Sequence, residues 1–246
     1  MKLLKAIKLL VLENLYTRKV HIHNDSAIFS FTFDDAPMTA WTNGARILEK
    51  INKTATFYIA TGMDNNKGDN RKLLNGDDIL TAHQKGHDIG CHTYSHMDCR
   101  KNAVTKVLSD CRTNTTELEK LTGKSTIEHF AYPFGMVGLR SKKSLRSKYL
   151  TLRTTDHGVN HGWTDMTHLR SVSLCSIAFT REKVMAAIKD AVKHNAWLIF
   201  YSHDIRESPS DWGISIEDFE WVVDQCAKAK GEILNVSQAY QKIVSA

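Results

Sequence analysis

Residues 27–37 of this 246-residue chain read AIFSFTFDDAP, an apolar run that ends in two adjacent aspartates. A short run with three phenylalanines predicts a strand that is buried on both faces, which is typical of a parallel sheet. Consecutive side chains of a strand point to opposite faces, and like charges repel each other. We therefore expect Asp34 and Asp35 to have different roles.

The same order of elements, a short apolar run and then a helical pattern, recurs along the chain. Helices are predicted near 40–51, 77–85 and 104–121 and after Thr180 and Ser215, and further strands at 55–60, 87–91, 128–131, 149–154, 168–174 and 196–201. Alternating strands and helices imply parallel pairing with right-handed crossovers. Both a (β/α) barrel and an open doubly wound sheet fit this pattern. Without an internal linker or repeat, one domain over 1–246 is the simplest prediction.

The composition is that of an ordinary globular protein, with 42% hydrophobic residues and a net charge of +6. The basic residues are scattered and are not interleaved with aromatic residues, so we expect no nucleic-acid partner. Five cysteines, an odd number without C-x-x-C spacing, indicate reduced thiols rather than a disulfide framework. Cys91 is expected to pack away from its neighbour His92, because adjacent strand residues face opposite sides.

Residues 1–20 predict a basic amphipathic helix that is too short and too charged to span a bilayer. Docking of this helix on the protein's own core is the simpler interpretation, and peripheral contact with an anionic membrane surface is the alternative. The segment has no small-x-small cleavage site. These features favour a cytoplasmic protein, with the inner membrane face as the place of any peripheral contact.

A metal site is predicted from Asp35 and two histidines four residues apart, His92 and His96. Imidazole nitrogens with one carboxylate suit zinc or another borderline divalent cation, and three protein ligands leave positions open for water. Asp34 would then be a free base acting on that water. His203 ends a late apolar strand and could protonate a leaving group. In a barrel, such strand ends converge on one face.

Four motifs, in this order, resemble those of the polysaccharide deacetylase family, also called carbohydrate esterase family 4 or the chitooligosaccharide deacetylase-homology domain. They are TFDDAP at 32–37, HTYSH at 92–96, FAYPFG at 130–135 and YSH at 201–203. Ala36 stands where the family usually has glycine, and Tyr201 where it usually has leucine. The resemblance extends from about Ala27 to the C-terminus.

The resemblance implies a distorted (β/α) barrel of about seven parallel strands and a bound Zn²⁺, or another divalent cation such as Co²⁺ or Ni²⁺. Asp34 would be the general base and His203 the general acid. Asp35, His92 and His96 would be the metal ligands. The backbone N–H of Phe134 would hold the oxyanion, and the substrate contacts would come from Tyr132, Pro133, Phe134 and Tyr201. The implied reaction removes an N-acetyl group from an amino sugar of a glycan or glycolipid precursor.

Two departures from the family pattern concern positioning residues. The family's third motif often carries an arginine that holds the base, and here that position is Ala131, so Arg153 or Arg170 is expected to supply the charge. The Asp-Trp motif that orients the acid is not clearly present, and Asp156 is the expected substitute. Deformylation of a sugar, hydrolysis of another amide and an inactive carbohydrate-binding relative remain alternatives.

Overall fold

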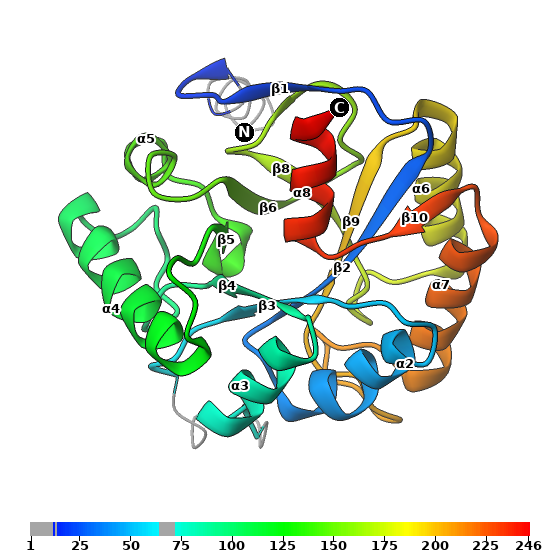
Figure 1. The fold of residues 1–246 in the computed structure, drawn as a ribbon, viewed down its shortest axis with the longest axis horizontal. Helices are drawn as coiled ribbons and strands as arrows, with labels where there is room; N and C mark the ends of the chain where they lie inside the picture. Colours follow the sequence, from blue (N-terminus) through cyan, green and yellow to red (C-terminus); the bar gives the residue numbers. More distant parts are fainter. Residues whose placement is uncertain (1–11, 13, 64–71) are drawn as a thin grey trace.

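The computed structural model describes residues 12, 14–63 and 72–246, and its centre is a closed barrel of seven parallel strands (Figure 1). In spatial order the strands are β2 (Ala27–Asp34), β3 (Thr56–Ile59), β4 (Asp88–Cys91), β5 (His129–Ala131), β6 (Thr151–His157), β8 (Leu169–Ser173) and β9 (Trp197–Ser202). The barrel closes because β2 also pairs with β9, from Ile28 opposite Trp197 to Phe33 opposite Ser202. The barrel prediction is confirmed, and the open sheet is not observed.

Helices surround the barrel in Figure 1. They are η1 (Ala40–Ala45) with α2 (Arg46–Glu49), α3 (Gly76–Gln84), α4 (Val104–Thr122), η2 (Pro133–Gly135), α5 (Leu139–Leu145), α6 (Arg181–His194), α7 (Ile216–Lys228) and α8 (Val236–Ser245). The five predicted from the sequence are present, whereas η2, α5 and α8 were not predicted. Thr180 and Ser215 accept hydrogen bonds from the amides of Lys183 and Asp218, so both predicted helix starts are capped by a side chain.

Three shorter strands lie outside the ring. Strand β10 (Gly231–Ile233) runs parallel to β2, and β1 (Lys19–Ile22) pairs antiparallel with β7 (Gly162–Asp165) as a separate two-stranded ribbon. One face of this ribbon joins α8 and the start of β9 in a second apolar cluster that includes Ile22, Trp197 and Val236. The amphipathic helix predicted over 1–20 lies mostly outside the described residues, and its predicted end is wrong, because Lys19 and Val20 belong to β1.

Strand β2 is buried on both faces, as expected for a parallel barrel. Its phenylalanines face the helices, where Phe31 contacts Phe200 and Phe219 with ring centroids 5.4 and 5.5 Å apart. Its alternate residues face the barrel interior, where Ser30 accepts a hydrogen bond from the Trp197 indole at 2.9 Å. The side chain of Asp34, at the end of the strand, belongs to the same alternating set and therefore also faces the barrel interior.

The five cysteines are free and buried, and Cys91 accepts a hydrogen bond from Asn114 of α4 at 3.2 Å. Cys91 thus faces α4, as predicted. Among the described residues, no helix has the length and apolar character needed to cross a membrane.

Replacement of Phe31 with Ala should lower the free energy of unfolding by about 3–5 kcal/mol, because it leaves a cavity between β2 and α7. Urea unfolding followed by circular dichroism measures this change. Ile51→Ala, at a site that is 39% exposed, is the control and should change stability by less than about 0.5 kcal/mol. Equal losses in the two variants would contradict a core centred on β2.

Candidate active site

The two aspartates at the end of β2 diverge, as predicted. Asp34 completes the strand and faces the barrel interior, whereas Asp35 and Ala36 adopt positive φ angles of 62° and 52°. Left-handed backbone is uncommon for residues with a side chain and is typical of strained functional sites. The turn brings Asp35 toward the histidines of the next motif.

Asp35, His92 and His96 lie together at the carboxyl ends of β2 and β4. Oδ1 of Asp35 is 3.6 Å from Nε2 of His92 and 3.3 Å from Nε2 of His96, and the three groups could hold a metal ion. The same Oδ1 is buried and makes no hydrogen bond within the described chain. A buried carboxylate oxygen without a partner is costly, and a cation between it and the imidazoles would satisfy it.

The ring of His92 is oriented by the backbone of β5. Its Nδ1 donates to the carbonyl of Ala131 at 2.8 Å, which turns Nε2 toward Asp35. Such a bond fixes the tautomer of a ligating histidine. Burial lowers the pKa of His92 to about 4, so its imidazole is neutral at physiological pH.

The loop that carries His96 is tied to helix α4 by Asp110, which the sequence analysis missed. The Asp110 carboxylate accepts hydrogen bonds from the amides of Tyr94 and Ser95 at 2.8 and 3.0 Å. Thr93 and His96 have positive φ angles of 60° and 52°, so these bonds hold an unfavourable loop conformation. The signal in the sequence is weak, because Asp110 is one of several polar residues on an amphipathic helix.

Arg153, at the inward face of β6, holds Asp34. Its Nη2 donates to both oxygens of Asp34 at 2.6 Å, and its guanidinium lies 5.2 Å from the ring centroids of Tyr58 and Tyr201. Burial alone would raise the pKa of Asp34, yet the charge of Arg153 holds that pKa below its ordinary value. Of the two predicted arginines, Arg153 therefore supplies the charge, while Arg170 donates to the carbonyl of His157.

His203 follows β9 and faces the same pocket, with Nε2 3.8 Å from Oδ2 of Asp35. The expectation that Asp156 orients this ring is wrong. Asp156 accepts from His168 at 2.7 Å, and Nδ1 of His203 donates to the carbonyl of Trp212 at 3.1 Å. A backbone carbonyl on the loop after β9 therefore holds the ring, and a motif of residue types cannot reveal such a partner.

These groups open into a pocket of about 410 Å³. Phe134 and Tyr201 line it, as predicted, together with Gly135, Met136, Thr155 and Trp212, which the sequence analysis did not name. Tyr132 and Pro133 are buried and are absent from the lining. The ring of Tyr132 instead packs on Phe130 with centroids 5.1 Å apart, in the core behind the pocket.

Comparison with known proteins agrees with this geometry. The family model named "Polysaccharide deacetylase" matches residues 22–152. The chain belongs to the polysaccharide deacetylase family. A comparison of the sequence with curated proteins found no match.

Solved structures show the fold of this deacetylase family member at low identity. PdaA of Bacillus subtilis, a family 4 carbohydrate esterase, is 16% identical with a TM-score of 0.63, covering 96% of this chain and 90% of its own. A family 4 acetyl xylan esterase from Clostridium thermocellum, in complex with a cobalt ion, is 17% identical with a TM-score of 0.62, covering 87% and 91%. The Xyl-CE4 domain of a xylanase from the hindgut metagenome of Trinervitermes trinervoides is 13% identical with a TM-score of 0.61, covering 89% and 91%.

Replacement of Arg153 with Met should lower the free energy of unfolding by about 3–5 kcal/mol, because it leaves a buried carboxylate unpaired. In the Asp34→Asn background, Arg153→Met should lower the free energy of unfolding by less than it does in the parent protein, because no buried charge is then left unpaired. A double-mutant cycle measured by urea unfolding gives the coupling energy. Strictly additive losses would contradict the pairing.

The loop after His203 is held by Asp204, which is buried and accepts from the amide of Ser210 at 2.9 Å, with Nε of Arg206 2.8 Å away. Burial raises the pKa of Asp204, but the Ser210 bonds and the Arg206 charge outweigh it and lower the pKa below its ordinary 3.8. The ionised group therefore stabilises the fold above pH 3.8, and this contribution is lost as pH falls through the folded-state pKa.

Asp204→Asn should consequently cost about 1–3 kcal/mol at pH 7, and the difference from the parent protein should shrink as pH falls below about 4. Urea unfolding at a series of pH values tests this. Asp211→Asn, an exposed position on the same loop, serves as the control. A difference that stays constant down to pH 3 would refute the role of the Asp204 charge.

Proposed function

We propose that the chain is a metal-dependent hydrolase that removes an N-acetyl group from an amino sugar of a glycan or glycolipid. The observation that carries the proposal is one pocket that combines the Asp35, His92 and His96 cluster with the buried base Asp34 and with His203. Family membership supports the hydrolase class, and the cobalt complex of the Clostridium thermocellum relative supports metal dependence.

The three prospective ligands fit a borderline divalent cation such as Zn²⁺. They offer two imidazole nitrogens and one carboxylate oxygen, and Oδ1 of Asp35 lacks any other partner among the described residues. When bound, the cation would act as a Lewis acid toward the acyl carbonyl and would make a water molecule more acidic.

Asp34 is suited to accept the proton of the attacking water. Arg153 keeps the carboxylate ionised and fixes its direction, and the inward face of β2 aims it into the pocket. The water oxygen forms a bond to the acyl carbon, and the backbone N–H of Phe134 is our candidate to stabilise the resulting oxyanion.

His203 follows β9, the strand that pairs with β2, and is suited to act as the acid in the same pocket. Its Nδ1 is held by the Trp212 carbonyl, so Nε2 faces the reacting centre and can donate a proton to the leaving nitrogen. The C–N bond then breaks, and acetate and the free amino sugar are released. A base and an acid at the ends of two paired strands in one pocket serve turnover, whereas an inactive binding relative needs neither.

Asp34→Asn should reduce turnover by at least about 100-fold, because the base is lost while the three prospective ligands stay in place. Loss of one acetyl group from N-acetylated glycans incubated with zinc-loaded protein, measured by mass spectrometry, tests the activity. Zinc stoichiometry, measured by atomic absorption, should not change.

Asp224→Asn, an exposed carboxylate on α7 that pairs with Lys228, is the matched control and should keep full activity. Full activity of Asp34→Asn would refute its role as base. Loss of a formyl rather than an acetyl group from the substrate would favour the deformylase alternative, and glycan binding without turnover by the parent protein would favour an inactive relative.

A further inference from the structure

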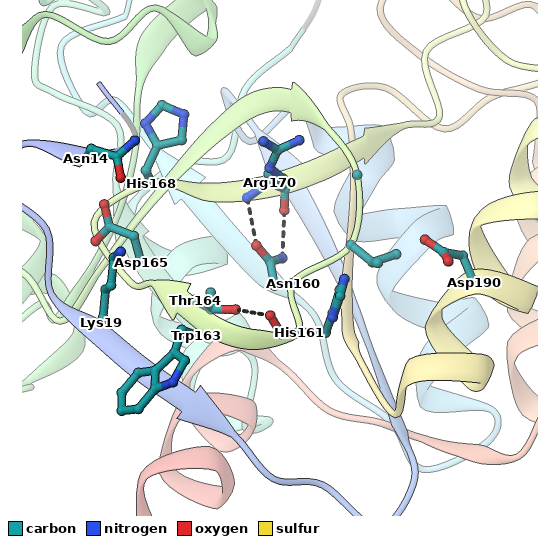
Figure 2. A pocket seen from close by; sticks show the side chains of 12 residues that line it. Asn14, Lys19, Asn160, His161, Trp163, Thr164, Asp165, His168, Arg170 and Asp190 are labelled. Atoms are coloured by element: carbon teal, nitrogen blue, oxygen red, sulfur yellow. Dashed lines mark hydrogen bonds between the residues drawn. The ribbon is translucent and has the colours of Figure 1, made fainter. Parts of the chain in front are cut away.

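A second pocket, of about 470 Å³, lies between the β1–β7 ribbon, the start of β8 and helix α6 (Figure 2). It shares no lining residue with the catalytic pocket. Most of its side chains are polar, and Trp163 is the one large aromatic side chain among the lining residues. The lining residues are Asn14, Lys19, Gly158, Val159, Asn160, His161, Trp163, Thr164, Asp165, His168, Arg170 and Asp190.

The back wall of this pocket is fixed by Asn160. Its side chain accepts from the amide of Arg170 and donates to the carbonyl of Arg170, both at 3.0 Å, as Figure 2 shows. Its backbone pairs with that of Trp197 at the start of β9. The amide of Asn160 is thus used within the protein, so the pocket is preformed rather than dependent on a ligand.

The two carboxylates of the lining are also matched by internal partners. Asp165 lies 2.7 Å from the Lys142 ammonium and accepts from the amide of Arg18 at 2.8 Å. Asp190 lies 3.0 Å from Nδ1 of His194. These carboxylates therefore do not impose a preference for cationic ligands on the pocket.

His168 offers a buried polar atom without a partner. Its residue is 4% exposed, its Nε2 donates to Asp156 at 2.7 Å, and its Nδ1 makes no hydrogen bond within the described residues. A buried, unsatisfied nitrogen is costly and is explained by a ligand or by water. Nδ1 can accept from a hydroxyl when the ring is neutral and can donate to an acid when the ring is protonated.

Trp163 and Lys19 supply the other features of a binding site. The indole is 70% exposed. It makes an edge-on contact with the ring of His21, with ring centroids 5.0 Å apart, and this contact restrains it on the ribbon. A flat, restrained and exposed indole beside polar groups is suited to stack on the apolar face of a sugar ring. Lys19 shares this face of the ribbon, is exposed, and forms no ion pair with a described residue.

We propose that this pocket is a second saccharide-binding site, which takes a sugar carrying an acidic group. Trp163 stacks on the ring, His168 hydrogen-bonds a hydroxyl or the acid, and the Lys19 ammonium pairs with the acid. The choice of a saccharide rests in part on the proposed function. A second site on a glycan-processing enzyme raises the local concentration of a polymeric substrate without contributing to the chemical step.

The test measures binding without turnover, by isothermal titration calorimetry on metal-free protein. The probe is a tetrasaccharide of alternating glucuronic acid and N-acetylglucosamine, and the N-acetylglucosamine tetramer is its neutral counterpart. The acidic probe should bind more tightly than the neutral one. Trp163→Ala should weaken binding of the acidic probe by about fivefold or more, and Lys19→Gln should remove most of the preference for it.

Lys50→Gln removes an equal charge at the residue after α2; it is the matched control and should retain binding of the acidic probe. Trp212→Ala removes the exposed indole at the catalytic pocket and reports any binding of the probe there. Failure of the parent protein to bind it, or loss only in Trp212→Ala, would overturn the second site. Equal affinity for both probes would overturn the acidic preference. Because no turnover is measured, either result is independent of whether the deacetylase proposal holds.

Discussion

The buried ion pair between Asp34 and Arg153 is the interaction on which the arrangement of the catalytic pocket depends. The two residues come from β2 and β6, strands that do not pair with each other, so they meet only across the interior of a closed barrel. Taking both charges out of water is expensive, and the cost is offset only by close geometry and further contacts. Tyr58 and Tyr201 provide such contacts by enclosing the guanidinium.

Backbone strain is concentrated around the same pocket. Five of the eight non-glycine residues with positive φ in the described chain belong to three of the four motifs, namely Asp35, Ala36, Thr93, His96 and Phe134. Such conformations cost free energy and persist where the surroundings enforce them. Here Asp110 fixes the histidine loop, and Gly135 at the next motif has no room for a side chain, because a Cβ atom would collide with Thr155.

Strand β6 connects the two pockets through the alternation of its side chains. Arg153 and Thr155 face the interior, where they hold the base and line the catalytic pocket. Asp156 faces outward and holds His168 in the second pocket. The same alternation explains the position of Tyr132, which shares the outward face of Phe130 and so packs in the core rather than in the pocket lining.

The sequence by itself determined the order of the seven barrel strands and of five helices around them, the divergence of Asp34 and Asp35, and the grouping of Asp35 with His92 and His96. These features follow from local patterns: apolar runs, side-chain caps, and polar residues placed where parallel strands end. Only the tertiary structure decided between Arg153 and Arg170, since both lie near strand ends and barrel closure alone selects the one that faces inward. It also decided the partner of His203, because a backbone carbonyl carries no residue signature, and it assembled the second pocket from segments that no single motif connects.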